Sequence, residues 1–227
     1  MPSSDGPRTI ARLVAAHELL ASNAVNDIYR QKLGLSEWTP AAASVFARLD
    51  KVMVRDKVDY TLFWRLLALV PETLLAHAGG AEGWTDAALQ AVLLSIGDMF
   101  YTPLSGSAAG DWCAILRDWL SLLRVSLDAK VSSSSSSSSS LSSSSEGLVV
   151  EALRVSSEMR LASPKYVLRE WMLVYAYKAL ERGDVGPMVE LHKLLRKPYD
   201  EQPDMVSKYF RRTPSEAQGK AGTAYMT

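Results

Sequence analysis

Two cations four residues apart are the clearest candidates for ligand chemistry in this sequence. Lys165 and Arg169 lie in the segment S-P-K-Y-V-L-R, near the predicted start of a helix. Side chains at this spacing meet on one helix face, and a helix N-terminus favours anions, so the pair could contact a phosphate or a carboxylate. Two structural alternatives are commoner for such a pair, an ordinary solvated face and an ion pair with a carboxylate from elsewhere in the chain.

Three carboxylates form a second candidate cluster. Asp50, Asp56 and Asp59 lie among the basic residues Lys51, Arg55 and Lys57. Such a group could form a metal site or an acid/base pair. The alternative that capping favours is a charged helix–loop–helix junction in which Asp59 caps the following helix.

The thiol and the imidazoles show no pattern typical of catalysis. Cys113, the single cysteine, lies in an apolar helical stretch and is predicted to be a small core residue, because a reactive thiol needs an electropositive and accessible setting. His17, His77 and His192 have no metal-ligand partner three or four residues further on. No phosphate-binding glycine loop and no kinase-type V-A-I-K, H-R-D or D-F-G is present. The sequence therefore predicts no catalytic residue and no metal ligand.

Charge and hydropathy exclude two classes of partner. Lysine plus arginine number 25, and aspartate plus glutamate also number 25, so there is no basic footprint for nucleic acid or an anionic membrane. No uncharged apolar run approaches the roughly 20 residues of a membrane span. The first residues, M-P-S-S-D-G-P-R, lack the apolar core of a secretory signal. We expect neither nucleic acid nor membrane as a partner.

The elements that must position these residues are helices. Apolar residues recur at three- and four-residue steps, and strict alternation is missing, so an all-α fold of about seven or eight helices is predicted. Pro40 opens one helix and Asp59 caps the next, whereas G-S-A-A-G at 106–110 is predicted to be a loop before a helix capped by Asp111. The predicted organisation is a flexible lead-in (1–8), a helical region (9–131), a disordered serine-rich insertion (132–145), a helical region that continues the same domain (146–200) and a polar, loosely ordered tail (201–227).

Residues 163–199 are predicted to form a helical hairpin. Ser163 would cap the first helix and Pro164 would occupy its first turn. Gly183 would end that helix in a left-handed conformation, Asp184 would cap the second helix and Pro198 would stop it. The buried faces would comprise Leu168, Trp171, Met172, Tyr175 and Ala179 in the first helix, and Val185, Met188, Leu191, Leu194 and Leu195 in the second.

The serine tract at 132–145 contains serine at every position except Leu141. Such a segment buries too little apolar area to offset its ordering entropy, so we expect a disordered surface loop between two helices. A phosphorylated regulatory switch is the alternative, since each phosphate would add charge to a neutral loop.

Four elements in order resemble one known family. They are Y-R-Q-K-L-G-L at 29–35, D-K-V-D-Y-T-L-F-W-R-L-L at 56–67, a weaker element around Trp119 and Leu120, and the hairpin with P-K-Y-V-L-R, E-R-G-D and K-P-Y. In this order and spacing they resemble the C-terminal region of the selenoprotein O family, protein adenylyltransferases with a kinase-like fold. The resemblance covers roughly residues 10 to 205, and the serine tract falls between matched blocks as an insertion would.

The resemblance implies a protein that uses ATP and Mg²⁺ to transfer AMP to hydroxyl side chains of protein substrates. In the family the residues that bind ATP and metal belong to a kinase-like core that is N-terminal to everything matched here. No catalytic residue therefore transfers to this chain, which is expected to be inactive alone and to bind no cofactor without the missing N-terminal core. A eukaryotic member would be expected in mitochondria and a bacterial member in the cytoplasm.

Two functional hypotheses remain open. The first is the C-terminal helical portion of such an adenylyltransferase, and the second is a non-enzymatic helical interaction module. A stand-alone enzyme of a new kind has little support. A portion that normally packs on a missing core is expected to expose an apolar face when isolated.

Overall fold

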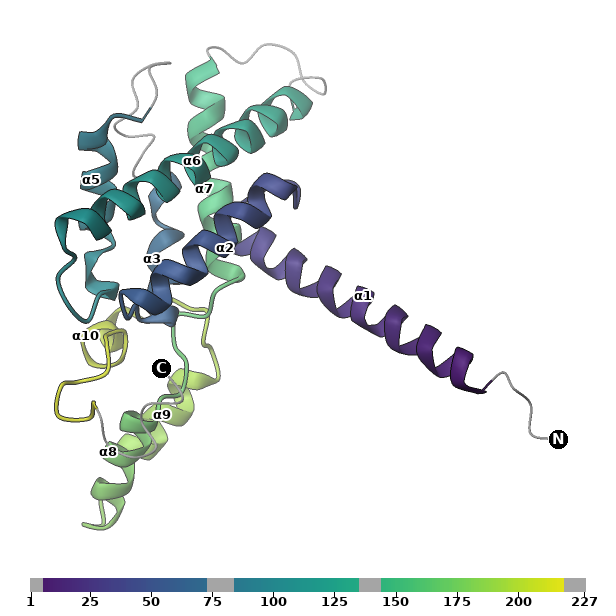
Figure 1. Ribbon diagram of the computed structural model, residues 1–227. Coiled ribbons are helices and arrows are strands. Elements are labelled where there is room, and N and C mark those ends of the chain that lie inside the picture. Colours follow the sequence, from purple (N-terminus) through teal and green to yellow (C-terminus); the bar gives the residue numbers. More distant parts are fainter. Residues whose placement is uncertain (1–5, 73–83, 135–143, 219–227) are drawn as a thin grey trace.

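The computed structural model describes residues 6–72, 84–134 and 144–218, and within these ranges the regular structure is helical (Figure 1). One isolated bridge joins Val58 and Phe100, and the described residues form no strand. The all-α prediction is therefore confirmed. The α-helices are α1 (Gly6–Lys32), α2 (Pro40–Arg55), α3 (Tyr60–Leu67), α5 (Asp86–Ser95), α6 (Gly106–Ser134), α7 (Ser144–Leu161), α8 (Glu170–Leu180), α9 (Gly186–Leu195) and α10 (Val206–Tyr209), with short 3₁₀ turns at Gly97–Met99 and Pro203–Met205.

The larger hydrophobic cluster lies among α2, α3, α5, α6 and α7, and we call residues 33–161 the main body. The long helix α6 packs against α2, α5 and α7. Trp64, Trp112 and Trp119 are buried at the centre. The Trp119 indole also donates a hydrogen bond to the Leu33 carbonyl at 2.9 Å, which attaches the end of α1 to α6. No described helix is both long enough and apolar enough to cross a membrane.

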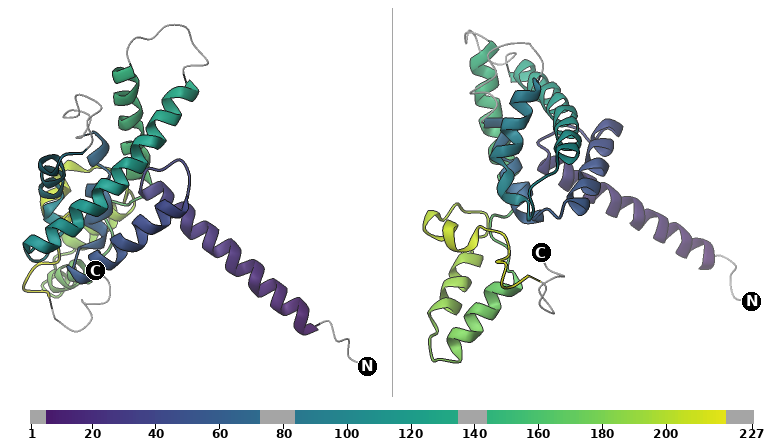
Figure 2. Two further views of the ribbon diagram at one scale, coloured as in Figure 1. Left: turned by 45° about the horizontal axis from the view of Figure 1, so that its top comes forward. Right: turned by 60° about the vertical axis from the view of Figure 1, so that its left-hand side comes forward.

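A smaller cluster belongs to α8, α9 and α10, and we call residues 164–217 the hairpin unit. The right-hand view of Figure 2 shows α8 and α9 side by side, below the main body. The apolar faces of α8 and α9 pack against α10 and the segment that precedes α8. The buried residues of this cluster are Tyr166, Trp171, Met172, Ala176, Leu191, Leu194 and Tyr209. Phe210 packs against both clusters and so lies at the boundary between the two units.

Helix α1 extends away from the rest of the molecule as a single rod (Figures 1 and 2). This agrees with the predicted helical region at 9–131, but the apolar residues of α1 face solvent, with Leu13 65% and Leu20 69% exposed. The helix ends before Gly34, which has a φ of +69°. A Cβ at Gly34 would meet Val155 Cγ1 at 2.7 Å and Met159 Sδ at 2.8 Å, so close packing also requires glycine here.

Helix starts follow capping chemistry, with one correction. Pro40 opens α2 as predicted, with Thr39 as its cap. Asp59 caps α3 as predicted, and its carboxylate accepts from the Leu62 N–H at 3.1 Å. The prediction of a loop at 106–110 is wrong, because α6 begins at Gly106. The Ser105 hydroxyl accepts from the Ala108 N–H and provides the cap. Asp111 instead forms an ion pair with Arg55.

The first helix of the predicted hairpin begins later in the chain than predicted. Helix α8 begins at Glu170, not at Pro164, since the N–H groups of Lys165 and Tyr166 both donate to the Pro198 carbonyl and hold this segment outside the helix. Gly183 does adopt the predicted left-handed conformation, with a φ of +82°. Asp184 was predicted to be the cap of α9, but the cap position is Val185; the Asp184 carboxylate accepts from the N–H of Gly186, the first residue of the helix.

Several residues that were predicted to be buried are exposed in the structure, and some that were predicted to be disordered are helical. Tyr175 and Val185, predicted to be buried, are 47% and 60% exposed. Serines 132–134 and 144–145 are helical, because extending an existing helix costs far less than starting one; positions 135–143 of the tract lie outside the described residues. Residues 6–8 belong to α1, and Tyr209 of the predicted polar tail is buried in the hairpin unit.

Candidate functional site at the junction of the sequence motifs

Three of the sequence elements converge where the main body meets the hairpin unit. Asp59 and Arg65 come from the 56–67 element, Lys165 and Arg169 from P-K-Y-V-L-R, and Tyr199 from K-P-Y. Asp59 and Arg65 lie at the start and near the end of α3. The cations of the second element lie in the extended segment before α8, and residues that are about 100 positions apart in sequence are thereby brought into contact.

The centre of this junction is a two-pronged ion pair between Arg169 and Asp59. Arg169 Nη1 lies 2.5 Å from Asp59 Oδ2, and Nη2 lies 2.7 Å from Oδ1. Both side chains are buried, with 4% and 2% of their surface exposed. The Tyr101 hydroxyl donates to the same carboxylate at 3.1 Å, while Asp59 also caps α3. A buried charge needs such complete pairing, since an unpaired one would be strongly destabilising.

Arg65 forms the second contact of the junction. Its guanidinium is 4% exposed and donates to the carbonyls of Arg160, Ser163 and Tyr199 at 2.8, 3.0 and 3.2 Å. It also contacts Glu201 Oε1 at 2.5 Å. One side chain on α3 therefore donates to carbonyls at the end of α7, just before the hairpin unit and after α9.

Lys165 completes the network on the side of the hairpin unit. Its Nζ lies 2.7 Å from Glu201 Oε2 and 2.9 Å from the Glu201 carbonyl oxygen, and 5.2 Å from the centre of the Phe210 ring. Burial raises the pKa of the Glu201 carboxyl, but hydrogen bonds and charge from Lys165 and Arg65 outweigh it and leave the pKa below its ordinary value. Glu201 is therefore held ionised between two cations.

The junction can fix the orientation of the two units relative to each other, but its cations are already paired with carboxylates of the same chain. Lys165 and Arg169, the predicted phosphate contacts, are both engaged by carboxylates, which is the ion-pair alternative of the sequence analysis. A phosphate contact at either cation stays a prediction, and such a ligand would have to displace Glu201 or Asp59. Sequence reasoning missed Arg65 and Glu201; the available signal was an arginine inside the apolar stripe of α3, at a position that requires burial.

The three carboxylates of the second candidate cluster are not brought together into one site. Asp59 pairs with Arg169, whereas Asp56 pairs with Arg55 and accepts from the Trp112 indole at 2.8 Å. Asp50 is exposed on α2. Across residues 6–72, 84–134 and 144–218, no group of three or more histidine, cysteine, aspartate or glutamate side chains is placed to hold a metal ion. The charged-junction alternative describes this region.

The remaining candidates lie apart from the junction. Cys113 is partly buried against the main cluster, and burial raises the pKa of its thiol, away from the reactive thiolate. His17 and His192 are exposed on different helices, and His77 lies outside the described residues. Neither of the two described histidines is part of the motif junction.

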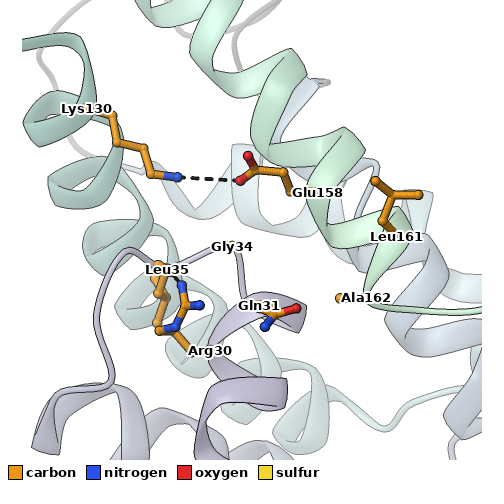
Figure 3. A pocket seen from close by; sticks show the side chains of 8 residues that line it. All are labelled: Arg30, Gln31, Gly34, Leu35, Lys130, Glu158, Leu161 and Ala162. Atoms are coloured by element: carbon orange, nitrogen blue, oxygen red, sulfur yellow. Dashed lines mark hydrogen bonds and ion pairs between the residues drawn. The ribbon is translucent and has the colours of Figure 1, made fainter. Parts of the chain in front are cut away.

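A pocket of about 400 Å³ lies between the end of α1, α6 and α7 (Figure 3). The motif at 29–35 supplies Arg30, Gln31, Gly34 and Leu35, and the other lining residues are Lys130, Glu158, Leu161 and Ala162. Lys130 Nζ lies 3.7 Å from a Glu158 carboxylate oxygen across the opening. A second, more apolar pocket of about 530 Å³ lies beside Leu93, Leu94 and Phe100.

Comparison with known proteins finds relatives along most of the chain. Proteins named protein nucleotidyltransferase YdiU are similar to it: that of Flavobacterium johnsoniae is 28% identical over 203 residues, covering 88% of this chain and 32% of the relative. Those of Stutzerimonas stutzeri and Azoarcus sp. are 29% and 30% identical, over 83% and 86% of this chain and 29% and 30% of the relatives. This chain is homologous to the protein nucleotidyltransferases of the selenoprotein O family. No family model matches it.

The chain spans about a third of the length of these nucleotidyltransferases. The resemblance stated from the motifs is thus confirmed for one portion of the family's sequence. Within that portion, the structure explains what several family motifs do locally. Asp59, Arg65 and Arg169 hold the two helical units together through contacts within the chain, and Lys165 binds Glu201, which is also the partner of Arg65.

Proposed function

We propose that this chain is the C-terminal helical portion of a protein adenylyltransferase, which transfers AMP from ATP to hydroxyl side chains of other proteins. In this reaction the hydroxyl oxygen forms a bond to the α-phosphorus of ATP, and pyrophosphate leaves. The support is the homology to protein nucleotidyltransferases along 79–88% of the chain for five relatives. ATP and Mg²⁺ would bind to a kinase-like core supplied outside this chain.

The proposed contribution of this chain is structural. The single observation that favours it is the junction, where Lys165 and Arg169, the candidate phosphate contacts, are paired with Glu201 and Asp59. A helical scaffold of this kind holds its two units in one orientation, and it would present that surface to a catalytic core. The chain alone would therefore neither bind ATP with magnesium nor transfer AMP.

Two measurements test the proposal separately. Calorimetric titration of the isolated chain with ATP and Mg²⁺ should show no micromolar binding, and such binding would overturn the scaffold assignment. For the activity, the matching region of the Azoarcus relative is replaced by residues 10–205 of this chain, and AMP incorporation into protein is measured. We expect a transfer rate within about tenfold of the parent, or about 1.4 kcal/mol in barrier. A folded chimera with no transfer would contradict the proposed family function for this portion.

A non-enzymatic helical interaction module is the second candidate function. The observation that favours it is the apolar face of α1, on which Ile10, Leu13 and Leu20 are more than 60% exposed. Large exposed apolar patches in soluble proteins mark interaction surfaces. The interaction module would be favoured over the enzyme portion if the chimera showed no AMP transfer while the chain itself still bound a partner protein.

A further inference from the structure

The second pocket, beside the end of α5, is mostly apolar, and we call it the α5 pocket. Its volume is about 530 Å³, within the roughly 300–1,000 Å³ that is typical of small-molecule sites. Leu93 and Phe100 are buried parts of its lining, with 8% and 7% of their surface exposed, whereas Leu94 is 81% exposed. The α5 pocket therefore offers apolar surface to a ligand that is itself partly apolar.

One cation lies against this apolar surface. Arg212, in the segment after α10, is the single charged residue among the described residues that line the α5 pocket. Its guanidinium donates to the Phe100 carbonyl and lies 6.0 Å from the centre of the Tyr101 ring. The next residue, Thr213, donates its N–H to the Tyr101 hydroxyl at 3.1 Å. These contacts fix the segment after α10, and with it the cation, relative to the pocket.

Arg212 keeps donors that its contacts within the chain do not use. An arginine side chain has five N–H donors, and the hydrogen bond to Phe100 uses one of them. Within the described part of the chain no carboxylate pairs with Arg212, whereas Arg65 and Arg169 each have one. Arg212 is also exposed. A carboxylate from solvent can therefore accept two parallel hydrogen bonds from this guanidinium, the geometry that arginine favours.

We propose that the α5 pocket binds an aliphatic carboxylate, with its head group on Arg212 and its hydrocarbon chain against Leu93, Leu94 and Phe100. A single cation matches a single negative charge, which favours a carboxylate over a doubly charged phosphate ester, because a second charge would be left without a partner. Burial of the chain against the apolar lining supplies the remaining affinity. The inference is independent of the proposed AMP transfer, since it uses only the contacts around this pocket.

An NMR titration of the whole chain with sodium octanoate tests the site, with leucine methyl groups as reporters and the ionic strength held constant. We expect saturable shifts of the Leu93, Leu94 and Leu104 signals, with a dissociation constant in the millimolar range or lower. Butanoate, which is four methylene groups shorter, should bind at least about tenfold more weakly, since each buried methylene group tightens binding by up to about fourfold. 1-Octanol, which has the chain without the charge, should bind at least about fivefold more weakly than octanoate.

Two matched pairs of variants separate the head group from the chain. Arg212→Gln should weaken octanoate at least about fivefold and leave 1-octanol within about twofold, because it removes the charge that meets the carboxylate. Arg211→Gln is its control, since that guanidinium lies 5.0 Å from the centre of the Trp171 ring in the hairpin unit, and it should change neither. Leu94→Ser should weaken octanoate and 1-octanol alike, whereas Val125→Ser, at an apolar residue that is 68% exposed and does not line the pocket, should change neither. Circular dichroism checks that each variant is folded.

Several results would overturn the proposal. These are no saturation at about 20 mM octanoate, equal weakening in the Arg211 and Arg212 variants, and tighter binding of 1-octanol than of octanoate. Tighter binding of octyl phosphate than of octanoate would overturn the assignment of a carboxylate head group. Shifts confined to leucines outside the pocket, such as Leu191 in the hairpin unit, would place the ligand elsewhere and would also contradict the proposal.

Discussion

The main body and the hairpin unit are both helical, but they differ in what holds them together. The main body buries three tryptophans, Trp64, Trp112 and Trp119, inside a large cluster to which five helices contribute. The hairpin unit has a cluster of seven buried residues from α8, α9, α10 and the segment before α8. Because apolar burial scales with the area removed from water, the main body has the larger source of stability and the hairpin unit depends more on its neighbour.

The contact between the two units differs from both hydrophobic clusters, because charged side chains dominate it. Arg169 pairs with Asp59, and Arg65 and Lys165 both pair with Glu201. Apolar contacts tolerate small changes of angle, whereas a two-pronged arginine–carboxylate pair requires one geometry. The comparison suggests that hydrophobic clusters stabilise each unit and that the ion-paired junction sets their relative orientation.

The largest expected effect comes from breaking the junction at its buried pair. Arg169→Ala leaves the Asp59 carboxylate buried and without its charged partner, which should lower the free energy of unfolding by about 3–5 kcal/mol. Urea denaturation measures the loss. Arg48→Ala is the control, because its ion pair with Asp118 is 41% and 51% exposed and should contribute less than about 1 kcal/mol. Equal losses in the two variants would contradict the assigned importance of burial.

Core truncations should separate the two units. Leu116→Ala in the main body and Leu191→Ala in the hairpin unit each remove a buried side chain and should cost about 2–5 kcal/mol. We expect Leu116→Ala to reduce hydrogen-exchange protection throughout the chain. Leu191→Ala should reduce it mainly in α8 and α9, because the main body keeps its own core. Uniform loss of protection in the Leu191 variant would show that the two units unfold together.

Two left-handed glycines allow a smaller and better matched comparison. Gly34 and Gly183 both have positive φ, but a Cβ would clash with Val155 and Met159 only at Gly34, while that at Gly183 meets open space. Gly183→Ala should cost about 1–2 kcal/mol from the backbone conformation alone. Gly34→Ala should cost about 1–3 kcal/mol more, since it also overpacks the contact of α1 with α7. Thermal unfolding compares the two variants, and equal midpoints would mean that α7 moves aside at little cost.

The smallest expected effect concerns Lys32, whose ammonium lies near Ser163 and over the Trp64 ring. Burial lowers the pKa of Lys32 to about 8, whereas an unfolded lysine has a pKa of about 10.4. Between these values the unfolded state binds more protons than the folded state, so stability should rise with pH over this window. Lys32→Met should reduce that slope relative to the unmodified chain in denaturant titrations at pH 7.5 to 10.5. An unchanged slope would contradict the shifted pKa.

Local chemistry made several elements predictable, and its failures have a common cause. Asp59 and Pro40 mark helix starts, and Gly183 marks a helix end, because each acts through groups a few residues away. The start of α8 was misplaced because Pro198, more than thirty residues later, withdraws two N–H groups from the helix. Burial of Tyr175 was predicted from periodicity, which shows that a face exists but not what covers it.

The sequence by itself determined that the chain is helical, where some of its helices begin, and to which family it is related, because caps, periodicity and motif order are all local patterns along the chain. Only the tertiary structure decided what the motif residues do. Lys165 and Arg169 were predicted as phosphate contacts from their four-residue spacing, which depends only on neighbouring positions in the sequence. Their partners Glu201 and Asp59 lie 36 and 110 positions away, and the pairing of charges across such distances depends on how the helices pack.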